Sequence, residues 1–134
     1  MTSLSDEAVD TLLAEARLHG ERAWVPYSNF RVGAAVLTAD GTTVGGCNVE
    51  NASYGLAVCG ERTAMFSAIA QGHRDLVALA VSCLDGDTSQ PATLMPCGAC
   101  RQVMLELLRP HALVIVDGVG RLGLDDLLPR PFRL

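Results

Sequence analysis

The sequence predicts an α/β fold, a three-layer α/β/α sandwich with one mixed five-stranded sheet. Apolar runs of strand length at 76–81 and 113–116 enclose a helical segment, and such a β-α-β crossover joins parallel neighbours. The hairpin-turn signal Asp40-Gly41 lies between two further strand-like runs and adds an antiparallel pair. The chain has 134 residues, 49% of them hydrophobic, so we expect one domain over 1–134.

The predicted elements follow the chain in order. The first, 5–19, is a helix because apolar residues recur every three or four positions, acidic residues open it and Gly20 follows it. Strands are expected over 32–38 and 43–49, on either side of the turn. A stripe of small and apolar residues predicts a helix at 59–71. The remaining elements are a buried strand at 76–81, a polar loop at 85–96, a helix at 98–108 ended by Pro110, a buried strand at 113–116, a weak strand at 119–123 and a helical turn at 125–128.

Charge and composition exclude several classes of function. The net charge of −5 has the wrong sign for a protein that binds a phosphate backbone, so we expect no nucleic-acid partner. No apolar run approaches the ~20 residues that span a bilayer, and the first residues do not resemble a signal peptide. We therefore expect no membrane partner and a cytoplasmic location. The odd number of cysteines, five, predicts reduced thiols that serve a metal or catalysis.

The densest cluster of chemical groups is Cys59-Gly60-Glu61 followed by Pro96-Cys97-Gly98-Ala99-Cys100. Three thiolates satisfy a catalytic zinc, which takes three protein ligands and keeps a fourth position open. By itself, Cys-x-x-Cys is equally typical of a redox pair or of half a closed structural zinc site. The closed site lacks a fourth ligand at local spacing, and a redox pair leaves the third cysteine and its neighbouring carboxylate unexplained.

Glu61 stands two positions after Cys59 in the first turn of a predicted helix. There it can reach a metal-bound water without ligating the metal, as a proton shuttle must. The alternative is a helix N-terminal glutamate that the helix dipole stabilises. Cys-x-Glu together with Pro-Cys-x-x-Cys is the Cys₃ form of the signature of zinc nucleobase deaminases, and it is far more specific than its parts.

On these motifs the sequence resembles the small homotetrameric cytidine deaminases over nearly its whole length, at 25–35, 46–54, 59–64 and 96–102. The resemblance implies one Zn²⁺ per chain held by Cys59, Cys97 and Cys100, with Glu61 as the proton shuttle. It further implies roles for six other residues: Phe30 packs against the pyrimidine, Asn48 and Glu50 hold the ribose 3′-hydroxyl, Arg62 hydrogen-bonds the cysteine ligands, and Tyr54 and Phe132 face the site of a neighbouring subunit.

Simple physical reasons support these implied roles, and each has an alternative. Asn48 and Glu50, two apart on a strand, would project to one face and share one hydroxyl, but they also suit a turn and a surface charge. Phe30 could equally be a core residue. Three thiolates leave a divalent site with a charge of −1, which Arg62 would offset unless it is simply an exposed helix arginine. Arg31 stands where relatives commonly have an uncharged residue, so we expect the pocket rim to differ.

The implied reaction is deamination of cytidine and 2′-deoxycytidine to uridine and 2′-deoxyuridine in pyrimidine salvage. A hydroxide on the zinc would attack C4 while Glu61 carries protons to N3 and to the departing amine. Two alternatives remain: a sister deaminase of another aminated pyrimidine nucleoside such as blasticidin S, and a non-catalytic module stabilised by zinc. Deaminases of polynucleotides typically carry histidine where Cys59 stands.

Overall fold

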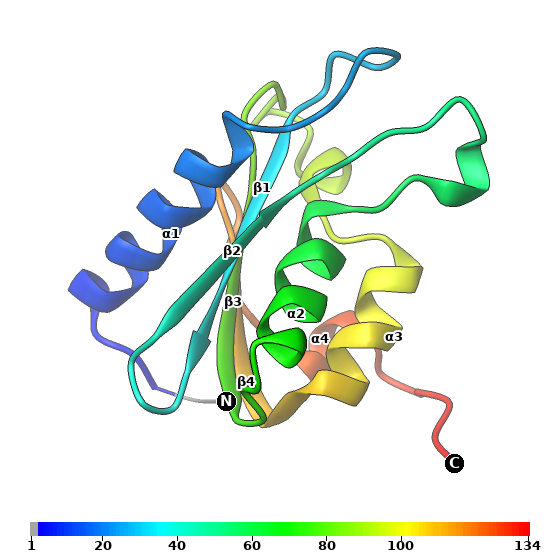
Figure 1. Cartoon of the computed structure of the whole chain (residues 1–134). Coiled ribbons are helices and arrows are strands. Elements are labelled where there is room, and N and C mark those ends of the chain that lie inside the picture. The colour runs from blue at the N-terminus through cyan, green and yellow to red at the C-terminus, as the bar shows by residue number, and fades with distance from the viewer. Residues whose placement is uncertain (1–2) are drawn as a thin grey trace.

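A computed structural model describes residues 3–134, which form one five-stranded sheet in the order β2-β1-β3-β4-β5. Helix α1 covers one face of this sheet, and α2, α3 and α4 cover the other (Figure 1). This confirms the three-layer sandwich. The strands are β1 Val32–Thr38, β2 Thr43–Cys47, β3 Leu76–Cys83, β4 Leu108–Val116 and β5 Gly120–Gly123, and the helices are α1 Asp6–Gly20, α2 Gly60–Ala70, α3 Gly98–Leu107 and α4 Leu124–Leu127.

The sheet is mixed, as expected. β3 and β4 are parallel neighbours joined through α3, whereas β1 is antiparallel to both β2 and β3. In a parallel crossover the helix runs back antiparallel to the strands, so helix N-termini lie near the strands' carboxyl ends. The N-termini of α2 and α3 accordingly lie together near the carboxyl ends of the strands, toward the top of Figure 1. The candidate site lies at that end of the sheet.

Helix α1 begins at an N-cap, Ser5, whose side chain accepts a hydrogen bond from the backbone N–H of Ala8. Its buried residues Val9, Leu12 and Ala16 pack on the sheet. The helix approaches β1 closely at Gly33, where an added Cβ would lie 1.9 Å from the carbonyl oxygen of Ala16. Gly33 therefore sets the spacing between the first layer and the sheet.

On the other face, α2 packs against the sheet through Ala64, Met65 and Ala68. Here too a glycine permits the contact, because a Cβ on Gly46 would lie 2.4 Å from the backbone nitrogen of Ala64. Helix α3 buries Cys100 and Met104 in the same cluster. Small residues at these contacts bring the N-termini of both helices close to the sheet.

The ends of β2 and β3 differ from the sequence prediction. β2 ends at Cys47 and not at residue 49, because the Asn48 side chain bonds the backbone of neighbouring residues and Val49 forms isolated bridges with Trp24 and Val58. β3 continues to Cys83, beyond the predicted end at 81.

The transition from α3 to β4 also differs. We expected the helix to end at residue 108, before Pro110, and the next strand to begin at 113, but α3 ends at Leu107 and β4 begins at Leu108. Pro110 lies inside β4, at an exposed position where the register with β3 is irregular. A proline is tolerated there because no regular ladder bond is needed from its nitrogen.

Two short 3₁₀ helices, Tyr54–Leu56 and Pro91–Leu94, lie between the main elements, the second of them in the segment predicted as a polar loop. No helix within residues 3–134 is long and apolar enough to cross a membrane.

The close approach at Gly33 generates a stability prediction. Gly33→Ala should lower the free energy of unfolding by about 1–3 kcal/mol, because the new methyl group collides with the α1 backbone. Gly55→Ala is the matched control, since a Cβ there meets no atom within 4 Å. Urea unfolding measures both variants, and equal stability of the two would contradict the prediction.

Candidate functional site

Three cysteine sulfurs meet where α2 and α3 begin. Cys59 is the N-cap residue of α2, Cys97 is the N-cap residue of α3, and Cys100 lies in the first turn of α3. Their Sγ atoms all lie within 4.8 Å of one another, and those of Cys59 and Cys97 are 3.7 Å apart. Tetrahedral zinc with Zn–S bonds of about 2.3 Å places two sulfurs about 3.8 Å apart. The donor set and its spacing therefore fit Zn²⁺.

The surroundings of Cys59 favour its thiolate form. Contacts from Cys100 and Arg62 lower the pKa of Cys59 to about 5. The Nη2 of Arg62 lies 3.5 Å from the Cys59 Sγ, so the guanidinium faces the sulfurs rather than solvent. Both helix N-termini add positive potential at the same place. These groups offset the negative charge that three thiolates bring.

Glu61 occupies the first turn of α2 beside this cluster and is only 4% exposed. Burial raises the pKa of its carboxyl to about 7, and the nearby Cys59 sulfur acts in the same direction. Glu61 lines a cavity of about 240 Å³ whose walls also include Phe30, Asn48, Cys59 and Cys97. The cavity thus joins a buried acid, two of the sulfurs and an aromatic ring.

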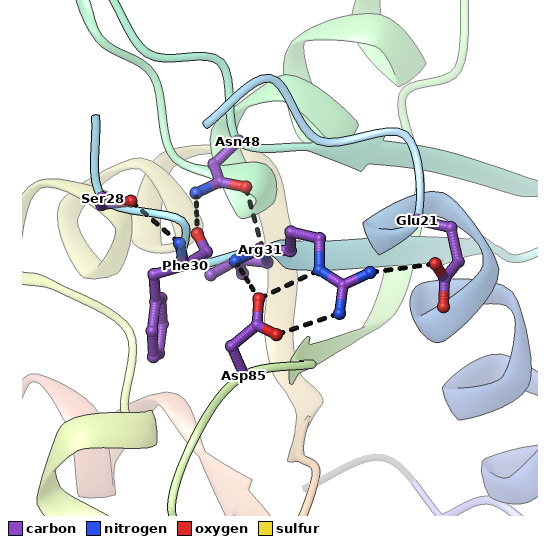
Figure 2. Close-up of polar contacts among 7 residues, drawn as sticks. Glu21, Ser28, Phe30, Arg31, Asn48 and Asp85 are labelled. Atoms are coloured by element: carbon purple, nitrogen blue, oxygen red, sulfur yellow. Dashed lines mark hydrogen bonds and ion pairs between the residues drawn. The ribbon is translucent and has the colours of Figure 1, made fainter. Parts of the chain in front are cut away.

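Asn48 holds the segment that carries Phe30. Its Oδ1 accepts a hydrogen bond from the backbone N–H of Val32 at 2.9 Å, and its Nδ2 donates to the carbonyl of Phe30 at 2.8 Å. Figure 2 shows the amide above this segment. Asn48 lies after the end of β2 and not on the strand, where the sequence had placed it.

Glu50 lines a different cavity, of about 350 Å³, together with Tyr27, Ser28 and Tyr54. Its carboxylate accepts hydrogen bonds from the backbone N–H groups of Tyr27 and Ser28 at 3.0 and 3.1 Å, and from the Ser28 hydroxyl. These bonds, the one from the Ser28 hydroxyl first, lower the pKa of Glu50. Asn48 and Glu50 therefore face separate cavities within the chain.

Tyr54 and Phe132 lie outside the cavity of Glu61. Their exposed fractions are 82% and 69%. Phe132 belongs to the C-terminal segment, which runs away from the N-termini of α2 and α3 (Figure 1) and is held by a hydrogen bond from Gln102 Nε2 to its carbonyl. The structure does not bring these two rings to the site of their own chain.

Several cavity residues were missed by sequence reasoning. Thr93, Leu94 and Met95 line the cavity from the segment predicted only as a polar loop. The apolar pair Leu94-Met95, directly before the Pro-Cys motif, was the available signal. Cys83 also lines the cavity, but it lies outside the three-sulfur cluster and burial raises its pKa to about 11.

Arg101 is another residue whose part in the site was missed. Its Nε donates to the carbonyl of Pro96 at 2.8 Å, and its Nη1 donates to the carbonyl of Leu127 at 2.9 Å. The guanidinium therefore fixes the loop that presents Cys97 against the end of α4. Only long-range contacts reveal this role, because Arg101 looks like any other helix arginine in the sequence.

Known proteins are similar to this chain in sequence and in fold. Residues 6–116 match the model of the cytidine and deoxycytidylate deaminase zinc-binding region. A cytidine deaminase from Halalkalibacterium halodurans is 47% identical over 125 residues, which cover 90% of this chain and 91% of that protein. The crystal structure of the cytidine deaminase from Burkholderia pseudomallei superposes with a TM-score of 0.83, at 45% identity, covering 96% of this chain and all of that one.

A more distant relative bears on substrate choice. The blasticidin-S deaminase of Bacillus cereus is 28% identical over 104 residues, which cover 73% of this chain and 74% of that protein. The identity to the two cytidine deaminases is much higher and extends over more of the chain. By its fold, its three-cysteine cluster and these similarities, the chain belongs to the cytidine and deoxycytidylate deaminase family.

Proposed function

We propose that this protein catalyses the zinc-dependent hydrolytic deamination of cytidine and 2′-deoxycytidine to uridine and 2′-deoxyuridine, with release of ammonia. The observation that carries the proposal is the buried Glu61, which lines one cavity with two of the three clustered sulfurs. Zinc held by those sulfurs supplies the activation of water as a nucleophile at neutral pH. The high identity to cytidine deaminases supports the substrate class.

Glu61 moves the protons in this proposal. Its carboxylate takes a proton from the attacking water and delivers it to N3 of the pyrimidine, which makes C4 more electrophilic. Its carboxylate then takes the remaining proton from the hydroxyl now bonded to C4 and passes it to the amino group. The C4–N bond breaks, the C4 carbonyl of the uracil ring forms, and ammonia leaves. Burial suits this task, because a carboxyl that is not strongly solvated exchanges protons readily near neutral pH.

The remaining residues of the site orient the nucleoside and balance charge. We assign Phe30 to the face of the pyrimidine and Asn48 to the ribose 3′-hydroxyl through the second hydrogen of its Nδ2, the first being engaged with the Phe30 carbonyl. Glu50 accepts from the same hydroxyl if the sugar extends toward its neighbouring cavity. Arg62 offsets the charge of the thiolates.

A substrate panel tests the proposed reaction. Purified protein is incubated separately with cytidine, 2′-deoxycytidine and blasticidin S, while ultraviolet absorbance, ammonia and zinc content are measured. We expect turnover of both nucleosides with one zinc per chain. Turnover of blasticidin S alone would assign the chain to its sister deaminases, and bound zinc without any turnover would indicate a non-catalytic module.

The shuttle role of Glu61 predicts a specific loss. Glu61→Gln should retain zinc but lower kcat for cytidine by about 10²- to 10⁴-fold, because the amide cannot accept and return a proton. Glu7→Gln is the matched control, since Glu7 occupies the first turn of α1 on the opposite face of the sheet. A Glu61→Gln variant with near wild-type kcat would refute the assignment.

The three-sulfur cluster predicts dependence on zinc. Cys97→Ser and Cys100→Ser should each bind far less than one zinc per chain and lose activity, because the hydroxyl is a poor zinc ligand. Cys47→Ser, whose thiol lies outside the cluster, should keep both zinc and activity. Metal analysis and the cytidine assay on the same samples provide the comparison, and full zinc in both cluster variants would exclude this ligand set.

We also propose a homotetramer in which neighbouring subunits complete each site. Large apolar side chains are exposed on the chain, which is expected of surfaces that become covered by other copies. They include Trp24, Val49, Tyr54, Leu56, Phe66 and Phe132. Tyr54 and Phe132 lie outside the Glu61 cavity of their own chain, so we propose that they act in the site of a neighbouring subunit.

Shared sites predict complementation between defective chains. Glu61→Gln lacks its own proton shuttle, and Phe132→Ala lacks the ring that it would supply to a neighbour. When the two variants are co-expressed, their activity should exceed the sum of the activities of the two variants expressed alone. A Phe132→Ala chain keeps its own Glu61 and can receive Phe132 from a Glu61→Gln neighbour. Light scattering checks assembly.

The control for this experiment pairs Glu61→Gln with Cys97→Ser. Both changes damage the chain's own site, so this mixture should gain no activity. A monomeric protein, or a Glu61→Gln and Phe132→Ala mixture without gain, would contradict the shared-site proposal.

The three-cysteine cluster also bears on where in the cell the protein acts. Thiolate ligands require reduced cysteines, which favours a cytoplasmic enzyme of pyrimidine salvage. We propose that residues 1–134 act there as one domain.

A further inference from the structure

We propose that the ion pair between Arg31 and Asp85 is a clamp that holds together the two walls of the Glu61 cavity and so positions Phe30 and Asn48 for the nucleoside. Arg31 and Asp85 are then positioning residues, since neither lines the cavity itself. The inference rests on the proposed function, because it concerns how the same cavity binds its substrate.

The pair is built from three hydrogen bonds to one carboxylate. The backbone N–H of Arg31 donates to Asp85 Oδ2 at 2.8 Å, the side-chain Nε donates to the same oxygen at 3.0 Å, and Nη2 donates to Oδ1 at 2.9 Å (Figure 2). A two-pronged arginine–carboxylate contact fixes the orientation of both groups, which a single bond does not. Because one donor belongs to the main chain, the carboxylate holds the backbone as well as the side chain.

The Asp85 carboxyl is ionised at neutral pH, so it forms an ion pair with the Arg31 guanidinium. The hydrogen bonds from Arg31 lower the pKa of Asp85 to about 2. Arg31 also donates from Nη1 to Glu21 at 3.1 Å, beyond the end of α1. The guanidinium therefore bridges the start of β1, the end of β3 and the α1 layer.

The first wall of the cavity contains Phe30 and Val32, which flank Arg31. On one side of this segment, Asn48 bonds the carbonyl of Phe30 and the N–H of Val32. At the residue between them, Arg31 donates its N–H to Asp85, and its carbonyl accepts from the N–H of Leu84 at 2.9 Å. The segment is thus held by Asn48 and by the chain that follows β3.

The second wall belongs to that following chain. Val81 and Cys83, four and two positions before Asp85, line the cavity. The loop after Asp85 leads to three further cavity residues, Leu94, Met95 and the zinc ligand Cys97. A shift of Asp85 would therefore move both the aromatic wall and the start of the loop that closes the opposite side. The nucleoside must fit between these walls, so its affinity depends on their separation.

A second ion pair in the same protein is a suitable control. Arg109 and Asp75 form another two-pronged contact, in which the arginine is exposed to a similar degree and the carboxylate is more exposed. Asp75 directly precedes β3 and Asp85 follows it, so the control pair lies at the opposite end of that strand. Neither Arg109 nor Asp75 is next in sequence to a residue of the cavity.

The test compares Asp85→Ala with Asp75→Ala in the whole protein. We expect Asp85→Ala to raise KM for cytidine by about tenfold while kcat stays within about twofold, because displaced walls weaken binding but leave Glu61 and the sulfurs in place. The Kd of uridine, the product, should rise in parallel. Asp75→Ala should change neither value, and zinc content should remain one per chain in both variants.

Conservative variants separate positioning from a general loss of stability. Asp85→Asn keeps an oxygen acceptor for the Arg31 backbone N–H but loses the negative charge. Arg31→Lys keeps the positive charge but loses the two-pronged contact. Both should give KM values between those of the wild type and Asp85→Ala. If Asp85→Ala does not fold, these two variants decide the question, and a wild-type KM in both would overturn the clamp.

Other outcomes are equally decisive. Equal KM values for Asp85→Ala and Asp75→Ala would overturn the inference, as would a loss of zinc and kcat with KM unchanged. Absence of cytidine turnover by the wild-type protein would instead overturn the proposed function, whatever the variants do.

Discussion

Three thiols gathered at the N-termini of two helices are the constraint on which the site depends. Negative sulfurs repel one another unless positive charge is close, and here the two helix ends and Arg62 provide it. The same geometry places Glu61 one residue inside α2, where it is buried beside the cluster. The metal site and the proton transfer that we propose for Glu61 therefore both depend on how α2 and α3 begin.

The layers can present those helix ends only because they pack closely on the sheet. Gly33 admits the backbone of α1 on one face, and Gly46 admits that of α2 on the other. A side chain at Gly46 would push α2 outward and carry its N-cap residue Cys59 with it. Close packing of α2 on the sheet thus contributes to the spacing of the sulfurs, which metal geometry restricts tightly.

The two polar side chains that we assign to the nucleoside also hold the walls of the two neighbouring cavities. Asn48 bonds the segment of Phe30 on both sides, and Glu50 bonds the loop at Tyr27 and Ser28. Such preorganisation reduces the entropy lost when a ligand binds. It also explains why these side chains are engaged before any nucleoside arrives.

The sequence alone determined the layered α/β fold, the order of its elements and the cluster of Cys59, Cys97 and Cys100. These features depend on local periodicity and on motifs that are contiguous in the chain, which a single sequence displays directly. The family resemblance then supplied roles for residues such as Asn48, roles that remain proposals.

Only the tertiary structure decided where the long-range contacts fall. Asn48 lies beyond the end of β2 and bonds the segment of Phe30. Pro110 lies within β4, and Leu94 lines the cavity from the segment predicted as a polar loop. Arg31 and Asp85, 54 positions apart, meet for the same reason. Such contacts arise from how separate elements pack, and no local pattern encodes which distant residue completes them.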